Sequence, residues 1–154
     1  MEDSPNLYRI IIEFLWQSGI RFHDLRCLFT FTWAITGLLL SGKVNLGAWA
    51  VFGKSSVQAS SKERQFSRWL HNGKINPSLV YRPMIRNVLA EWQEKRVYLA
   101  LDSSMLWDRF VLVRVALIYR GRALPVSWTV LVSNSAMVKL QDYQSILQEA
   151  AALL

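Results

Sequence analysis

The chain has 154 residues, of which 52% are hydrophobic and 12% aromatic, and it carries 18 Lys and Arg against 11 Asp and Glu. This apolar content excludes an intrinsically disordered chain, and the length suits one domain or two small ones. The single cysteine, Cys27, excludes an internal disulfide framework, and no Cys/His cluster in the sequence indicates a zinc finger. The formal net charge of +7 favours an anionic partner, chiefly nucleic acid or a lipid surface.

The first residues and one long uncharged run bear on the location of the protein. The start, MEDSP, carries acidic residues and no apolar run follows it at once, so we expect an intracellular protein without a secretory signal peptide. Residues 27–42 contain no charge, but Thr30, Thr32 and Thr36 interrupt the run before Lys43 ends it. A spanning helix needs about 20 predominantly apolar residues. We therefore expect a buried core helix and no membrane partner; a membrane-surface protein that uses this run is the alternative.

Three helices are expected in the first third of the chain. Pro5 suits a first helical position, and apolar residues follow it at helical spacing until Gly19. A second helix is expected over residues 23–40, and because it is apolar nearly all round, we expect it to be buried. Asn45 suits the N-cap of a short third helix that ends at Gly53.

The next helix has the clearest start signal in the sequence. Ser60 and Glu63 have the S-x-x-E spacing of a capping box, and Gly73 is the expected stop. A further helix is expected over residues 76–95, with a restart or kink at Pro83. The apolar stripe of the first of these two helices consists of Phe66, Trp69 and Leu70.

Basic residues are concentrated between residues 54 and 86, where seven Lys and Arg stand against one acidic residue, Glu63. This stretch supplies +6 of the net charge of +7. A short helix followed by a basic one resembles a helix-turn-helix unit, whose second helix can enter the major groove. The connector is longer than the usual three-to-four-residue turn, so we expect DNA binding but do not infer groove insertion. For any single basic residue, an ordinary solvated face is the alternative. The candidate DNA-binding residues are Lys54, Lys62, Arg64, Arg68, Lys74, Arg82 and Arg86.

From Arg96 onward the sequence pattern changes to β-strands. Apolar and β-branched runs predict strands over residues 97–101, 110–119 and 123–132. A link centred on Gly121 joins the last two strands as a hairpin. Pro125 and Trp128 within the third strand fit an edge of the sheet or a bend better than a central strand.

A final helix follows the strands and completes the order β-β-β-α. This order predicts an α+β fold with a helical, DNA-binding-like region over residues 1–95 and a second region over residues 96–154. The apolar side of the final helix is expected to consist of Leu140, Tyr143, Leu147, Ala150, Ala151 and Leu154.

Asp102 is the candidate catalytic residue. It follows the apolar run VYLAL, and an ionised carboxylate at the end of a buried strand is costly unless a cation or hydrogen-bond donors meet it. A metal ion is one such cation, and a carboxylate is typical of a hard-metal site assembled from several segments. A turn or cap residue is the alternative.

The stretch YLALDSSMLWDRFVLVRVALIYRGRALPVSW resembles the opening of the catalytic domain in bacterial insertion-sequence DDE transposases of the insertion-sequence-four type. That family shows a hydrophobic strand ending in ALD with Ser or Thr after it, then a strand leading to GRA-x-P and a Trp. The segments SGKVNLGAWA, QFSRWL and QDYQSILQEAALL are similar to the family as well, so the resemblance covers most of the chain from about Leu25 onward. The matching residues are Ala100, Leu101, Asp102, Ser103 and Ser104 in the first element, and Gly121, Arg122, Ala123, Pro125 and Trp128 in the second.

The resemblance implies an RNase H-like fold in which two Asp and one Glu hold two divalent metals, Mg²⁺ or Mn²⁺, for phosphoryl transfer on DNA. The resemblance thus implies that Asp102 is the first catalytic Asp and a metal ligand. The other two positions have no counterpart, because Asp108 is expected in a turn and Asp142 and Glu149 on the solvated side of the last helix. We expect the chain by itself not to hold a metal tightly.

The ending of the sequence favours an N-terminal fragment of such a transposase. The last helix closes in AALL without a Gly, Asn or Pro stop, and three strands leave an incomplete RNase H-like domain. We expect a cytoplasmic, bacterial protein that binds the terminal repeats of a mobile element, as a homo-oligomer or with a missing C-terminal half. The alternative is a DNA-binding remnant or regulator that competes with intact transposase for the same ends.

Overall fold

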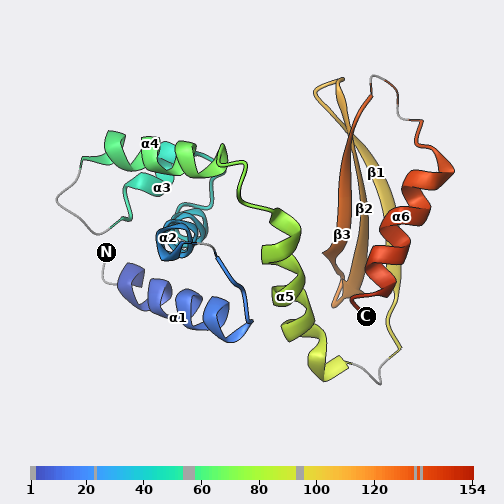
Figure 1. The fold of residues 1–154 in the computed structure, drawn as a ribbon, viewed down its shortest axis with the longest axis horizontal. Helices are drawn as coiled ribbons and strands as arrows, with labels where there is room; N and C mark the ends of the chain where they lie inside the picture. Colours follow the sequence, from blue (N-terminus) through green and yellow to red (C-terminus); the bar gives the residue numbers. More distant parts are fainter. Residues whose placement is uncertain (1–2, 23, 54–57, 93–95, 134, 136) are drawn as a thin grey trace. The chain divides into compact units, whose positions relative to one another are not determined.

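A computed structural model describes residues 3–22, 24–53, 58–92, 96–133, 135 and 137–154 of the chain. Its helices and one three-stranded antiparallel sheet confirm the α+β class, and the chain divides into two compact units, Met1–Met84 and Ile85–Leu154 (Figure 1). The unit boundary falls within a helix, ahead of the change of pattern at Arg96. The elements are α1 (Asp3–Gln17), α2 (Leu25–Ser41), α3 (Leu46–Ala50), α4 (Ala59–Leu70), α5 (Pro77–Leu89), the 3₁₀ turn η1 (Ala90–Trp92), β1 (Leu99–Leu106), β2 (Phe110–Tyr119), β3 (Arg122–Val132) and α6 (Leu140–Ala151).

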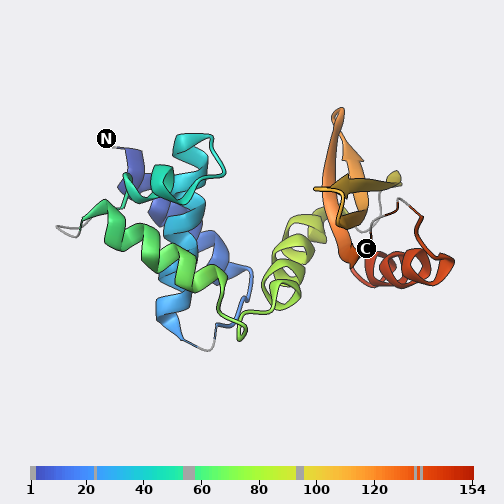
Figure 2. The ribbon, with the colours of Figure 1, turned by 90° about the horizontal axis from the view of Figure 1, so that it is seen from above.

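In the first unit, α2 lies between α1 and α4 (Figures 1 and 2). Buried apolar residues of α1 and α2 form its larger core cluster, and the first half of α5 packs against the same cluster. The helix α1 ends close to Gly19, which has a φ of +72°, a conformation that glycine adopts without steric cost. The buried members of the cluster are Ile11, Leu15, Ile20 and Leu28.

The uncharged run forms α2, and its threonines are buried within the helix. The hydroxyls of Thr30, Thr32 and Thr36 each donate to the carbonyl four residues earlier, at 2.8 Å. These bonds satisfy polar groups that burial otherwise leaves costly. Burial is confined to part of the helix surface, since Phe29 and Leu39 are exposed, so the expectation of burial all round is wrong. Among the described residues, no helix combines the length and apolar character needed to cross a bilayer.

The short helix α3 packs closely on α2 and has the predicted N-cap. The Asn45 side chain accepts a hydrogen bond from the Ala48 backbone N–H at 2.9 Å. Trp49 is buried, and its indole Nε1 donates to the Lys43 carbonyl at 2.6 Å. A Cβ added at Gly37 would lie 2.6 Å from Trp49 Cβ, so only glycine allows this approach of the two helices.

The helix α5 begins at Pro77 as predicted, with the Asn76 side chain accepting from the Ser78 N–H at 2.9 Å. It continues through Pro83 as one helix and ends at Leu89, where η1 follows. The expected end near Lys95 lies outside the described residues.

The sheet has the order β1-β2-β3, with both neighbouring pairs antiparallel. β2 has the predicted bounds, whereas β1 begins two residues later than predicted and continues to Leu106. β3 lies at an edge, as its Pro125 predicts. The register between β2 and β3 shifts between Val115, which pairs with Ser127, and Ala116, which pairs with Pro125. Val126 has no partner in β2 and is the extra residue of a β-bulge.

The two faces of the sheet differ in what lies on them. One face, which we call the α6 face, carries the fully buried row of β2 residues and is covered by α6. Ser127 on this face donates from Oγ to Glu149 Oε2 of α6 at 2.6 Å. We call the opposite face, which carries Asp102, the Asp102 face. The buried row consists of Val111, Val113, Val115 and Leu117.

The orientation of α6 differs from the predicted one. The most buried residues of α6 are Ile146 and Ala150, and Leu153 just after the helix is buried too. Ala150 belongs to the predicted apolar side, whereas Leu140 and Leu147 of that side are exposed. The helix has two adjacent apolar sides, and the sequence pattern does not show which of them meets the sheet. Glu149, expected to be solvated, is partly buried against Ser127, so that expectation is wrong.

Candidate nucleic-acid interface and the Asp102 position

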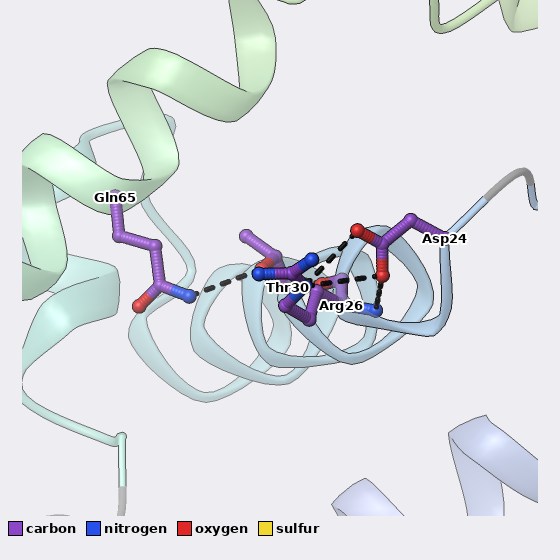
Figure 3. Close-up of polar contacts among 4 residues, drawn as sticks. All are labelled: Asp24, Arg26, Thr30 and Gln65. Atoms are coloured by element: carbon purple, nitrogen blue, oxygen red, sulfur yellow. Dashed lines mark hydrogen bonds and ion pairs between the residues drawn. The ribbon is translucent and has the colours of Figure 1, made fainter.

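The basic helix α4 is fixed to the first unit by its apolar side. Phe66 is only 2% exposed and meets Trp49 edge-on, with 6.1 Å between ring centroids. Trp69 stacks on Phe31 at 5.3 Å with an interplanar angle of 17°. Gln65 Nε2 donates to the hydroxyl of Thr30 in α2 at 3.1 Å, as Figure 3 shows. These contacts fix the rotation of α4 about its axis, which determines the side chains that it presents to solvent.

The start of α4 differs from the predicted capping box. The helix begins at Ala59, and its N-cap is Gln58, whose side chain makes no capping hydrogen bond. Ser60 therefore lies inside the first turn instead of preceding the helix, and the capping-box prediction is wrong. The first turn contains no acidic residue, so the positive end of the helix dipole keeps its attraction for anions.

One side of α4 brings together two arginines and two serines. Ser61, Arg64, Ser67 and Arg68 line a shallow hollow on the surface of the first unit. Residues at these spacings share one side of a helix, and here it is the side turned away from Phe66. We call these four residues the α4 basic face. Guanidinium groups bind phosphate in a bidentate manner, and serine hydroxyls add neutral hydrogen bonds to phosphate oxygens.

Arg64 and Arg68 differ from Arg26 in their surroundings. The carboxylate of Asp24 caps α2 by accepting from the Arg26 backbone N–H at 2.8 Å, and it also pairs with Arg26 Nε at 3.0 Å (Figure 3). In the described part of the chain, no acidic side chain pairs with Arg64 or Arg68. The α4 basic face therefore keeps its positive charge for an external anion.

The other predicted DNA-binding residues lie elsewhere. The stem of Lys62 runs beside Gly53, close to the apolar side of α4. Lys74 and Arg21 line a separate pocket of about 290 Å³ in the first unit. Arg82 is exposed on α5.

Two predicted residues fall outside the first unit's described surface. Arg86 belongs to the second unit, where its Nη2 donates to the Ala152 carbonyl at 3.3 Å. Lys54 lies outside the described residues. Of the seven predicted residues, the structure brings Arg64 and Arg68 together on one face; Ser61 and Ser67 were missed, although their helical spacing from the arginines was a usable signal.

Asp102 lies within β1 and not at its end. It pairs across the strands with Arg114, which in turn pairs with Trp128, so the three residues form one row on the Asp102 face. Arg114 Nη2 lies 2.8 Å from Asp102 Oδ2, and Ser104 Oγ donates to the same oxygen at 3.3 Å. The Asp102 side chain is 49% exposed. The prediction of a carboxylate at the end of a buried strand is therefore wrong.

The other acidic residues do not complete a metal site with Asp102. Asp108 lies in the turn between β1 and β2, as predicted, and Asp142 lies in the first turn of α6. Glu149 accepts the Ser127 hydrogen bond. Across the part of the chain that the structure describes, no three His, Cys, Asp or Glu side chains come together as metal ligands would.

Comparison with protein-family models, with curated proteins and with solved structures finds no match to this chain. The features of the chain that bear on function are therefore the α4 basic face, the Asp102 row and the resemblance of sequence segments.

Proposed function

We propose that the protein binds DNA through the α4 basic face and that it is of the insertion-sequence transposase type. The observation that carries the proposal is the joint exposure of Arg64 and Arg68 with two serine hydroxyls on a helix fixed by Phe66. A rigid helix holds the backbones of Arg64 and Arg68 one turn apart, and their long side chains can reach neighbouring phosphates of one DNA strand.

The charge distribution supports an electrostatic mode of binding. Phosphate contacts release condensed counterions, so the affinity falls steeply as salt rises. In this proposal Arg64 and Arg68 supply such contacts, and the α4 basic face presents no Asn or Gln to read adenine edges. On this account α4 mainly positions the protein on DNA, and the terminal repeats of an element are recognised with the help of other residues.

The second unit carries the catalytic part of the proposal. Three antiparallel strands followed by a helix have the order that an RNase H-like domain requires at its start. Asp102 lies on the first strand, as the family resemblance requires, while Gly121 lies in the β2–β3 turn and Pro125 at the bulge. In this proposal Asp102 is the first catalytic carboxylate of a phosphoryl-transfer enzyme.

The described donors do not fit a two-metal site for Mg²⁺ or Mn²⁺. Asp102 is the one carboxylate in its row, and the Arg114 guanidinium already occupies one of its oxygens. Two-metal sites need several clustered carboxylates. Further ligands have to come from another segment or another chain, which is consistent with a homo-oligomer or with a separate C-terminal half in a bacterial cytoplasm.

A second candidate function is a DNA-binding regulator that competes with transposase for the element ends. The Asp102–Arg114 ion pair favours it, because a carboxylate paired with a guanidinium is satisfied in the absence of a metal. Such a regulator binds DNA through the α4 basic face and does not catalyse strand transfer.

Two assays on the purified full chain test the proposal. Duplex binding is measured from low to high salt, and cleavage of an element-end duplex is measured with Mg²⁺ or Mn²⁺ present. Binding that weakens steeply with salt supports both candidates, and absence of binding at low salt overturns both. Cleavage that Asp102→Ala abolishes supports the enzyme, whereas binding without cleavage supports the regulator.

A further inference from the structure

The turn between β1 and β2 has a backbone conformation that is unusual for its residues. Trp107 and Asp108 both have a φ of +51°, and the Arg109 N–H donates to the Leu106 carbonyl at 3.2 Å to close the turn. Positive φ is uncommon outside glycine, and for a bulky residue it is a destabilising outlier. Asp tolerates this region better than most residues, so the outlier is Trp107.

The β2–β3 turn in the same sheet provides an internal comparison. Its two residues, Arg120 and Gly121, also have positive φ, at +48° and +74°. Tight hairpin turns require this conformation, and glycine, Asn and Asp supply it at least cost. Each turn therefore has one residue that tolerates positive φ, Asp108 in the first and Gly121 in the second. The other position holds a long side chain in both turns, and Trp107 differs from Arg120 in presenting an exposed aromatic ring.

The strain at Trp107 is not offset by burial of its ring. The residue is 86% exposed, and its ring meets the ring of Phe110 edge-on, with 6.5 Å between centroids. Arg109 places its guanidinium carbon 5.4 Å from the centroid of the same Phe110 ring. The turn therefore presents a large aromatic surface to solvent, with a cation beside it.

We propose that Trp107 is a stacking platform for an unpaired nucleic-acid base, with Arg109 contacting the neighbouring phosphate. This inference rests on the proposed function and assigns single-stranded DNA as the form bound at the second unit. Every base has a π face, so stacking on an aromatic ring tolerates any sequence. The carboxylate of Asp108 in the same turn repels phosphates, which disfavours a duplex backbone lying across the turn and favours an approach by the base.

The test compares Trp107→Asn and Trp107→Phe in the full chain. Asn tolerates positive φ, so we expect Trp107→Asn to keep a Tm no lower than that of the unaltered chain. We expect its affinity for a labelled oligothymidylate to fall by between about fivefold and about 150-fold, the range for loss of one stacked base. Trp107→Phe retains most of the affinity. The slope of affinity against salt stays unchanged in both, because neither variant removes a cation.

Trp16→Asn is the matched control, since Trp16 is 68% exposed on α1 with no positive φ. It should leave oligothymidylate binding unchanged. Undiminished binding by Trp107→Asn, or no oligothymidylate binding by the unaltered chain, overturns the inference. A fall in Tm that lowers duplex and single-strand binding alike overturns it too, because Trp107 is then structural. If Trp107→Asn weakens binding to anionic lipid vesicles but leaves oligothymidylate binding unchanged, Trp107 contacts a membrane surface. This result also overturns the inference.

The two proposals fail in distinguishable ways. If the chain does not bind duplex DNA but still binds oligothymidylate through Trp107, the proposal that the α4 basic face binds DNA is wrong. The proposal that Trp107 stacks on a base is then supported. If duplex binding persists and Trp107 has no effect on oligothymidylate, the reverse holds.

Discussion

Arg114 Nη2 lies 2.8 Å from Asp102 Oδ2, and the two side chains are directly opposite each other on β2 and β1. Both are partly exposed, at 42% and 49%. The residue on which the catalytic interpretation depends is therefore neither buried nor uncompensated. Its availability to a metal is tied to a cation on the neighbouring strand.

The Asp102–Arg114 pair is expected to contribute little to stability. Exposed ion pairs contribute about 0–1 kcal/mol, because solvent screens the charges and both side chains lose conformational freedom. Asp102→Asn should therefore lower the free energy of unfolding by less than about 1 kcal/mol, as measured by urea denaturation. A much larger loss would mean that this carboxylate is structurally essential, and activity assays on its variants would then need a stability correction.

Phe66→Ala should destabilise the first unit strongly. The side chain is 2% exposed and fills the contact between α4 and α3, and comparable deletions cost about 3–5 kcal/mol. Leu70→Ala is the control, because Leu70 lies on the same helix but is 53% exposed. Thermal unfolding followed by circular dichroism distinguishes the two; equal effects would contradict the packing of α4.

Gly37→Ala should disrupt the contact of α2 with α3. Its new Cβ would lie 2.6 Å from Trp49 Cβ and 2.7 Å from Trp49 Cα, and neither atom belongs to a flexible side-chain end. Overpacking of this kind costs about 1–3 kcal/mol. At Gly73, where no atom lies within 4 Å of an added Cβ and φ is not positive, the same substitution should be tolerated. A comparison of the two midpoints in urea checks the prediction, and a neutral Gly37→Ala refutes it.

Tyr8 makes stability depend on pH in alkaline solution. Burial raises the pKa of the Tyr8 hydroxyl above its usual 10.0, since the side chain packs on Trp33 with 4.3 Å between ring centroids. The unfolded chain therefore loses this proton first. The stabilisation is fully present below about pH 10 and is lost as the pH rises through the folded pKa. Tyr8→Phe should make the decline of unfolding free energy above pH 10 shallower; burial also raises the pKa of Tyr81, so part of the decline remains.

Local signals in the sequence predicted most elements. The Asn45 cap, the Asn76–Pro77 start and the β2–β3 hairpin each depend on residues close together in the chain, and the structure has all three. The edge position of β3 followed in the same way from Pro125.

Features that depend on tertiary packing were not predictable. The side of α6 that meets the sheet contains the buried Ile146. The hydrogen bond from Ser127 of β3 to Glu149 of α6 also fixes this side, and it depends on residues of two elements. The end of β1 was placed too early because the pattern changes from apolar to polar at Asp102, although the strand continues through the polar residues. That misplacement also hid Arg114 as the partner of Asp102, since the pairing requires the register of two strands.

The salt dependence of duplex binding shows whether the α4 basic face binds DNA. Arg64→Ala with Arg68→Ala is compared with Arg9→Ala and Lys43→Ala, a control pair of exposed residues that removes the same charge from α1 and from the α2–α3 connection. Loss of two phosphate contacts should reduce the slope of log affinity against log salt by about two, and the control pair should leave it nearly unchanged. Equal slopes for the two double variants would contradict a DNA interface on α4.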